Sequence, residues 1–120
     1  MPKKGDKKQR KPLGDINDPQ GFAVMAEAYF TSMQVTNYAE ATIRNRYVYL
    51  RYFVDWCDER GITRPSEVTR AVLERYQRYL YHYRKQNGDP LSFRSQGLRL
   101  SSLKAFFGYL AKHHMILYNP

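Results

Sequence analysis

Apolar side chains recur at three- and four-residue spacing in four stretches of the chain, which is the pattern of amphipathic α-helices. The first stretch predicts a helix over residues 19–34, with Asp18 as its N-cap. Pro19 then takes the first helical position, where its missing N–H costs no hydrogen bond. The apolar stripe of this helix consists of Phe22, Met25, Ala26, Tyr29 and Met33.

The second stretch predicts a longer helix over residues 39–60, which Gly61 ends because glycine is favoured just after a helix C-terminus. Its buried seam is predicted to consist of Ile43, Tyr47, Leu50, Val54 and Cys57. On a helical wheel, aromatic residues lie on one flank of this seam and arginines on the other. The aromatic flank is Tyr49, Phe53 and Trp56, and the arginine flank, facing outward together, is Arg44 and Arg51.

The charge of residues 39–60 is polarised along the predicted helix. Arg44, Arg46 and Arg51 come early, whereas Asp55, Asp58 and Glu59 come late. The helix dipole favours the reverse order, because the N-terminal end already carries roughly half a positive charge. A bound anion would remove this penalty, so the start of the helix is a candidate anion-binding surface.

Two further helices complete the pattern. Thr69 is expected to cap a helix over residues 70–86, which the turn sequence at residues 87–90 ends. The buried face of this helix is predicted to be Val72, Leu73, Tyr76, Tyr79, Leu80 and Tyr83. The last helix falls within residues 91–116, with Gln96, Leu100, Leu103, Phe107, Leu110 and His114 on one face. No window alternates like a half-buried strand, so the fold class is predicted to be all-α, a compact four-helix bundle over residues 18–120.

Residues 1–17 differ from the rest of the chain because they are rich in Lys and Pro and nearly free of apolar side chains. We predict a disordered basic arm there, since such a segment buries too little surface to offset its ordering entropy. Before Leu13 it carries six basic and one acidic side chain, which supplies +5 of the formal net charge of +9. A pI near 9.8 points to a polyanionic partner, so the basic residues of the folded domain must be clustered to bind one.

Catalysis is not expected from these 120 residues. The histidines lack metal-ligand spacing, and neither a phosphate-binding loop nor a dinucleotide-binding glycine motif occurs. His114 is expected at the core boundary, and Cys57, the single cysteine, as a buried structural thiol in a reducing compartment. No apolar run reaches the ~20 residues that cross a bilayer. We therefore expect a cytoplasmic, non-enzymatic domain that uses no metal, cofactor, small-molecule ligand or membrane.

A second basic and hydroxyl-rich cluster occupies the first half of the last predicted helix. It consists of Arg94, Ser95, Arg99, Ser102 and Lys104. Backbone N–H groups at helix starts, with Arg and Ser or Thr beside them, are a recurring phosphate-binding arrangement. Two helix starts of the same character favour a nucleic-acid surface over two unrelated solvated faces.

Two segments together resemble the N-terminal core-binding domain of tyrosine recombinases, the phage-integrase and Xer-like family. In ATIRNRYVYLRYFVDWCDERG, residues 41–61, a Thr, an aliphatic residue, a Leu, an aromatic and a Trp stand in register before a closing Gly. In LSFRSQGLRLSSLKAFFGYLAKHHMILYNP, residues 91–120, a Ser-rich start leads into a basic helix, the pattern L..L+.FF.YL and a closing Asn-Pro. One departure is that Arg46 and Tyr49 stand where the family often has a Tyr and an acidic residue.

The resemblance covers roughly residues 20–120 and implies a SAM-like bundle that grips one side of a recombination site in duplex DNA, beside sister subunits. It also implies a separate catalytic domain after residue 120 that performs strand transfer, so no tyrosine here is the nucleophile. By position, the family's DNA contacts on the second helix fall on Thr42, Arg44, Asn45, Arg46, Tyr49 and Arg51. On the last helix they fall on Ser92, Arg94, Ser95, Arg99 and Lys104.

Two other functions fit the same pattern. A protein-interaction bundle would use exposed aromatic residues to dock a partner helix or a sister subunit. An RNA-binding helical module would prefer single strands, although nothing in the sequence predicts the usual stacking sheet.

Overall fold

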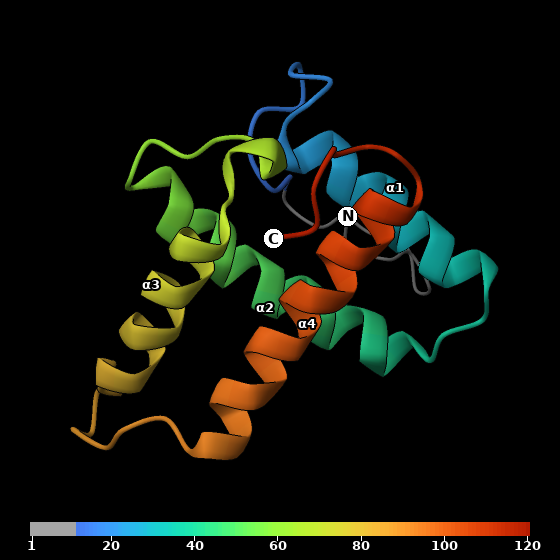
Figure 1. The fold of residues 1–120 in the computed structure, drawn as a ribbon. Coiled ribbons are helices and arrows are strands. Elements are labelled where there is room, and N and C mark those ends of the chain that lie inside the picture. Colours follow the sequence, from blue (N-terminus) through green and yellow to red (C-terminus); the bar gives the residue numbers. More distant parts are fainter. Residues whose placement is uncertain (1–11) are drawn as a thin grey trace, which may run out of the picture.

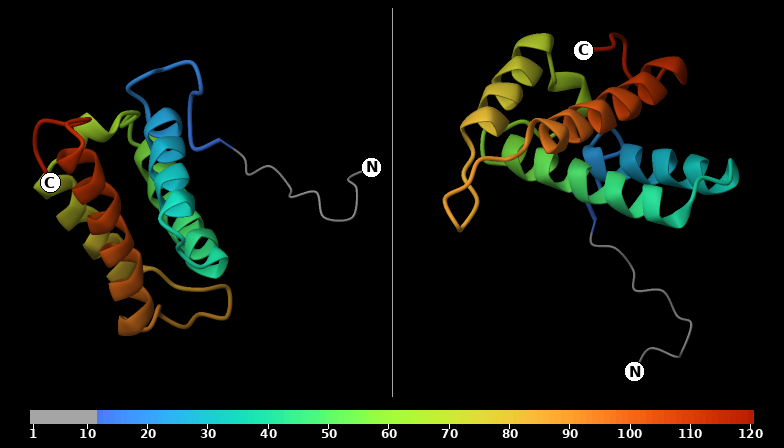
Figure 2. Two further views of the ribbon diagram at one scale, coloured as in Figure 1. Left: turned by 90° about the vertical axis from the view of Figure 1, so that its right-hand side faces the viewer. Right: turned by 90° about the horizontal axis from the view of Figure 1, so that it is seen from below.

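The computed structural model describes residues 12–120, which fold into four α-helices and one short 3-10 helix. The helices are α1 (Phe22–Val35), α2 (Glu40–Asp58), α3 (Arg70–His82) and α4 (Phe93–Lys112), with the 3-10 turn η1 at Pro65–Glu67. α1 and α2 run side by side in opposite directions, and α4 packs against all three other helices (Figures 1 and 2). The predicted all-α, four-helix architecture is confirmed for the described residues.

The core of the bundle is built around aromatic rings. Phe53 of α2 is 0% exposed, and its ring centroid lies 4.9 Å from that of Tyr76, 6.1 Å from Phe107 and 6.3 Å from Phe22. The ring of Trp56 stacks on Phe53 at 6.0 Å and is itself buried. The prediction that Phe53 and Trp56 lie on an outer flank of α2 is therefore wrong, because α3 and α4 pack against that flank and enclose it.

The rest of the predicted α2 seam is largely confirmed. Ile43, Leu50 and Val54 are buried and Tyr47 is partly buried. The Cys57 thiol is buried as predicted, and its burial raises its pKa to about 12. Gly61 follows the helix with a φ of 76°, the left-handed conformation that favours glycine after a helix.

The start of α1 differs from the prediction. Residues 18–21 form a turn, in which the Gly21 N–H donates to the Asp18 carbonyl at 3.0 Å, and Gly21 takes the N-cap position. Asp18 does not cap the helix, because its carboxylate accepts hydrogen bonds from the Gln20 N–H at 3.1 Å and from Arg64 Nε at 2.8 Å. Pro19 fits the second position of such a turn as well as it fits a first helical position, and the contact with Arg64 favours the turn.

α3 is shorter than predicted. Thr69 caps it as expected, accepting the Val72 N–H at 3.2 Å, but the helix ends at His82 and not at residue 86. From Tyr83 the chain is extended, and the following turn is closed by the Lys85 N–H donating to the Asp89 carbonyl at 2.8 Å. Tyr79 and Tyr83, predicted to be buried, are exposed, whereas Val72, Tyr76 and Leu80 are buried.

At the end of α4, the predicted core position of His114 is also wrong. The helix ends at Lys112, and His114 lies beyond it, exposed and with a φ of 58°. Of the other apolar positions predicted for this face, Leu103, Phe107 and Leu110 are buried and Leu100 is partly buried.

The N-terminal boundary lies earlier than the sequence suggested. Residues 1–11 of the predicted arm lie outside the described residues. Leu13 is 3% exposed and belongs to the core, so packing of the folded domain begins before residue 18.

Within residues 12–120, no helix is long and apolar enough to cross a lipid bilayer. The same residues contain no group of three or more His, Cys, Asp or Glu side chains that could hold a metal ion.

Candidate DNA interface

The start of α2 presents polar side chains to solvent, among them the acidic Glu40 in its first turn. Arg44 and Asn45 are exposed and Thr42 is half-buried, and within the described part of the chain Arg44 makes no hydrogen bond or ion pair. Ala39 occupies the N-cap position and offers no side-chain acceptor to the first N–H groups of the helix. The guanidinium of Arg44 is therefore available for an external anion.

Arg46, two residues further along α2, is held inside the protein instead. Its Nη1 donates a hydrogen bond to the Tyr29 hydroxyl of α1 at 2.9 Å, and its guanidinium lies 5.3 Å from the ring centroid of Tyr38. Burial raises the pKa of Tyr29, and the nearby charge of Arg46 partly offsets the rise. Arg46 thus ties α2 to α1, which is a structural role of its own.

Arg51 is also engaged by the fold. Its Nη2 donates to the Pro12 carbonyl at 2.9 Å and to the Tyr47 hydroxyl at 3.1 Å, and its Nη1 lies 3.9 Å from the Asp55 carboxylate. Although Arg44 and Arg51 share an edge of α2, only Arg44 projects without such partners. Tyr49, on the opposite flank, is half-buried.

At the start of α4, the hydroxyl groups cap the helix. The Ser92 Oγ accepts the Ser95 N–H at 3.1 Å and lies 3.1 Å from the Ser95 Oγ. Arg94 between them is exposed and makes no hydrogen bond or ion pair within residues 12–120. Ser92 and Ser95 thus fix the helix start from which Arg94 projects.

Arg99, one turn further along, lies where α2, α3 and α4 meet. Its guanidinium stacks over the ring of Tyr52 of α2, 4.4 Å from the centroid. Its positive charge also reaches the buried Tyr76 of α3, where it counters the burial that raises the pKa of the Tyr76 hydroxyl. Tyr52 could not be recognised as a site residue from the sequence, because its contact with Arg99 joins two separate helices.

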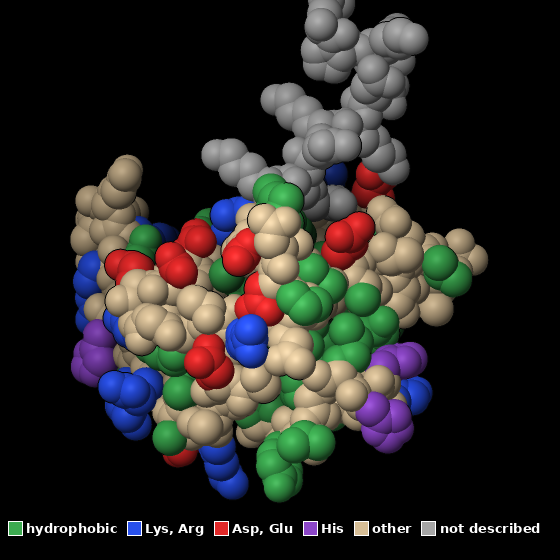
Figure 3. All heavy atoms as spheres, turned by 90° about the horizontal axis from the view of Figure 1, so that it is seen from above, with side chains coloured by type: hydrophobic (Ala, Val, Ile, Leu, Met, Phe, Trp, Pro, Cys, Tyr) green, Lys and Arg blue, Asp and Glu red, His purple; other side chains and the backbone are tan. Residues whose placement is uncertain are grey.

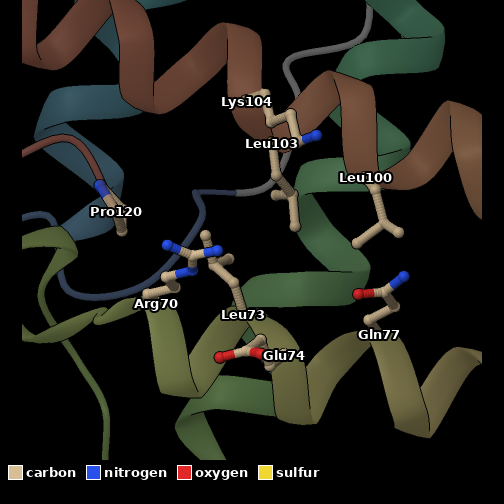
Figure 4. A pocket seen from close by; sticks show the side chains of 8 residues that line it. All are labelled: Arg70, Leu73, Glu74, Gln77, Leu100, Leu103, Lys104 and Pro120. Carbon is tan, nitrogen blue, oxygen red and sulfur yellow. The ribbon is translucent and has the colours of Figure 1, made fainter.

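Lys104 lies apart from these residues, on the other flank of α4. Figure 4 shows it at the edge of a groove between α4 and α3 that Leu73 and Gln77 of α3 line together with Leu100. The predicted contact residues are therefore not one patch. Arg44, Asn45, Arg94, Ser95 and Arg99 belong to α2 and the first half of α4, whereas Lys104 faces α3.

Residues 25–116 match the family described as "Phage integrase, N-terminal SAM-like domain". The chain belongs to this family. The match spans α1 to α4, so the family assignment rests on the whole bundle.

Relatives of this SAM-like domain come from bacteria and archaea. The chain is 50% identical over 106 residues to a protein of Ralstonia nicotianae described as tyrosine recombinase XerC 2. That alignment covers 86% of this chain but 30% of the relative, so the chain spans less than a third of that protein's length. A crystal structure of the N-terminal domain of a phage integrase/site-specific recombinase from Haloarcula marismortui is 25% identical, with a TM-score of 0.64 over 80% of this chain and 92% of the other.

The SAM-like domain has an uneven distribution of charge. α2 and α4 both begin in the lower half of the molecule as drawn in Figure 1, and both are seen from below in Figure 2, right. The upper face, shown in Figure 3, carries acidic side chains gathered across its middle.

Proposed function

We propose that this chain is the core-binding domain of a site-specific tyrosine recombinase and that it binds double-stranded DNA through the starts of α2 and α4. In this proposal the domain grips one side of a recombination site and has no catalytic activity of its own. Strand cleavage and transfer belong to another part of the parent protein, in keeping with a relative described as a tyrosine recombinase, of which the alignment covers only 30%.

The observation that carries the proposal is the pairing of two basic helix starts on one side of the bundle. Arg44 on α2 and Arg94 on α4 are exposed cations without partners among the described residues, and each lies within the first turns of its helix. The guanidinium of arginine can donate two parallel hydrogen bonds to phosphate oxygens or to base edges. The N–H groups at helix starts add to the attraction for phosphate. The acidic side chains on the upper face (Figure 3) would repel the phosphates of a duplex from that face.

The shape of the bundle also fits duplex DNA. The first half of α4 crosses α2, since Arg99 of α4 stacks on Tyr52 of α2. Two crossed helices of this kind present their starts to different stretches of the phosphate backbone. A helix fits the major groove, which is about 12 Å wide. In this proposal, exposed Asn45 and the arginines contact base edges as well as phosphates.

Binding is tested by fluorescence anisotropy with a labelled 20-base-pair duplex, a single strand of the same sequence and a salt titration. We expect the duplex to bind more tightly than the single strand, with log Kd changing by about 4 to 8 per decade of salt, from roughly 0.9 per phosphate contacted. Equal or tighter binding of the single strand would favour an RNA-type module, and no salt-dependent binding would refute the proposal.

A protein-interaction role has its own supporting observation. Phe93, Leu117 and Tyr118 are 80%, 92% and 82% exposed, and large exposed apolar side chains often mark contacts with other proteins. Size-exclusion chromatography at several salt concentrations separates the two roles. A dimer that forms without DNA and persists at high salt would support protein contact, whereas a monomer that shifts only with duplex would support DNA binding first and subunit assembly on it.

A further inference from the structure

Arg99 is the most constrained of the predicted contact residues. Its guanidinium plane rests on the Tyr52 ring at 4.4 Å, and its Nε is buried without a hydrogen-bond partner. The Tyr76 hydroxyl lies beside Arg99, whose charge and polar contact lower the pKa that burial raises, although neither the Tyr76 hydroxyl nor the Arg99 Nε forms a hydrogen bond of full geometry. α4 and α3 thus enclose the inner side of the arginine, and α2 supplies the surface under its flat face.

This environment leaves only the terminal nitrogens of Arg99 able to contact an external group. A guanidinium carries its five N–H donors in a rigid planar fork, and burial of the Nε leaves the two terminal nitrogens to make contacts. The side chain as a whole is half-buried, so part of it still meets solvent.

The contact with Tyr52 sets the orientation of the Arg99 guanidinium. The Tyr52 side chain is 47% exposed and is not needed to fill the core, unlike its neighbour Phe53 at 0%. A large aromatic ring left half in solvent beside a cation is explained by the stacking contact itself, since arginine is attracted to aromatic faces. Tyr52 also belongs to α2, so it couples the orientation of Arg99 on α4 to the other DNA-facing helix.

We propose that Tyr52 is a positioning residue that holds the Arg99 guanidinium in place for a two-pronged contact with a pair of neighbouring acceptors on duplex DNA. This inference rests on the proposed function. The acceptor pair is either two phosphate oxygens or the O6 and N7 atoms of a guanine in the major groove, because both match the spacing of the fork.

The test compares Tyr52→Phe with Tyr52→Leu. Phenylalanine keeps the aromatic face and should bind the duplex as the wild type does, whereas leucine should weaken binding about fivefold, the scale of a lost cation–π contact. In an Arg99→Ala background, Tyr52→Leu should cause no further loss, because residues that act as one unit are not additive. In an Arg44→Ala background the loss should remain, since Arg44 makes no contact with Tyr52.

Arg99→Lys provides a second variant that keeps the charge while removing the planar fork. We expect a loss at least as large as that of Tyr52→Leu, because lysine neither stacks nor bonds two acceptors in the same way. To identify the acceptor, a duplex that the wild type binds is first selected from a random pool. The same duplex is then synthesised with 7-deazaguanine, which lacks the N7 acceptor, in place of guanine. A fall in wild-type affinity that is absent in Arg99→Lys assigns the contact to a guanine, and no change assigns it to phosphate.

The outcomes separate this inference from the proposed function. If the wild type binds duplex and Tyr52→Leu binds equally well, or if Tyr52→Leu and Arg99→Ala are fully additive, the inference is wrong and the proposed function stands. If the wild type does not bind duplex at all, both fail. Circular dichroism and the unfolding midpoint are measured for each variant, and should Tyr52→Leu not fold, Tyr52→Gln, which suits a half-exposed position and also lacks the aromatic face, replaces it in the same two backgrounds.

Discussion

Replacement of Arg46 by alanine separates the arginines that build the fold from those that face outward. Arg46 donates a 2.9 Å hydrogen bond to the Tyr29 hydroxyl and lies 5.3 Å from the Tyr38 ring centroid. The hydrogen bond contributes about 1 kcal/mol, and a partly exposed cation–π contact about 0.5–1 kcal/mol. Arg46→Ala should therefore lower the free energy of unfolding by about 1.5–2 kcal/mol, which corresponds to roughly 6–10 °C in the unfolding midpoint of a domain of this size.

The matched control is Arg44→Ala, which removes the same side chain two positions earlier in α2. Arg44 is exposed and has no partner within residues 12–120, so its loss should change stability by less than about 0.5 kcal/mol. Urea unfolding followed by circular dichroism at 222 nm measures both. A double-mutant cycle with Tyr29→Phe should return a coupling of about 1 kcal/mol, because that variant removes only the acceptor of the hydrogen bond.

The result that would refute this reasoning is an Arg46→Ala variant as stable as Arg44→Ala. It would mean that the contacts with Tyr29 and Tyr38 contribute no net stability and that Arg46 is free for an external partner. A cycle with no coupling would exclude the hydrogen bond in particular.

Three further predictions concern the bundle itself. Phe53→Ala should cost about 3–5 kcal/mol in urea unfolding, because the ring is fully buried among other aromatics, and a loss below 1 kcal/mol would contradict the core described here. Ser92→Ala should cost about 1 kcal/mol by removing the cap of α4, whereas Ser92→Asp should be neutral, and equal losses would exclude a capping role. Burial raises the pKa of Cys57 to about 12, so the stability contributed by its neutral thiol is present below the unfolded pKa of ~8.5 and is lost as the pH rises toward 12. The stability advantage of the wild type over Cys57→Ala should therefore shrink between pH 8 and pH 11 in thermal unfolding, and an advantage that grows would show the opposite shift.

Much of the fold was predictable because local patterns and tertiary packing agree. The spacing of Ile43, Leu50 and Val54 predicts the seam of α2, and Thr69 predicts the start of α3. The start of α1 was not predictable, because Asp18 followed by Pro19 suits either a helix cap or a turn. The choice depends on Arg64, which lies 46 residues away in the sequence.

The candidate site was predicted in outline only. The charge polarity of α2 and the basic start of α4 predict which helix ends are candidates for binding an anion. A helical wheel cannot show which arginines make contacts within the fold. Arg46 and Arg51 are held by Tyr29 and by the Pro12 carbonyl, and Lys104 faces α3. These contacts depend on how separate segments pack, so they become visible only in three dimensions.

The measurement that tests the central claim most directly is the duplex affinity of Arg44→Ala/Arg94→Ala against that of Arg75→Ala/Arg78→Ala across a salt titration. Both pairs remove two exposed arginines, the first from the starts of α2 and α4 and the second from α3, so the net charge falls equally. The account predicts that the first pair weakens binding about tenfold or more and lowers the salt slope by about 2, while the second pair changes both far less. Equal effects of the two pairs, or unaltered affinity in the first, would contradict a DNA-binding surface at these helix starts.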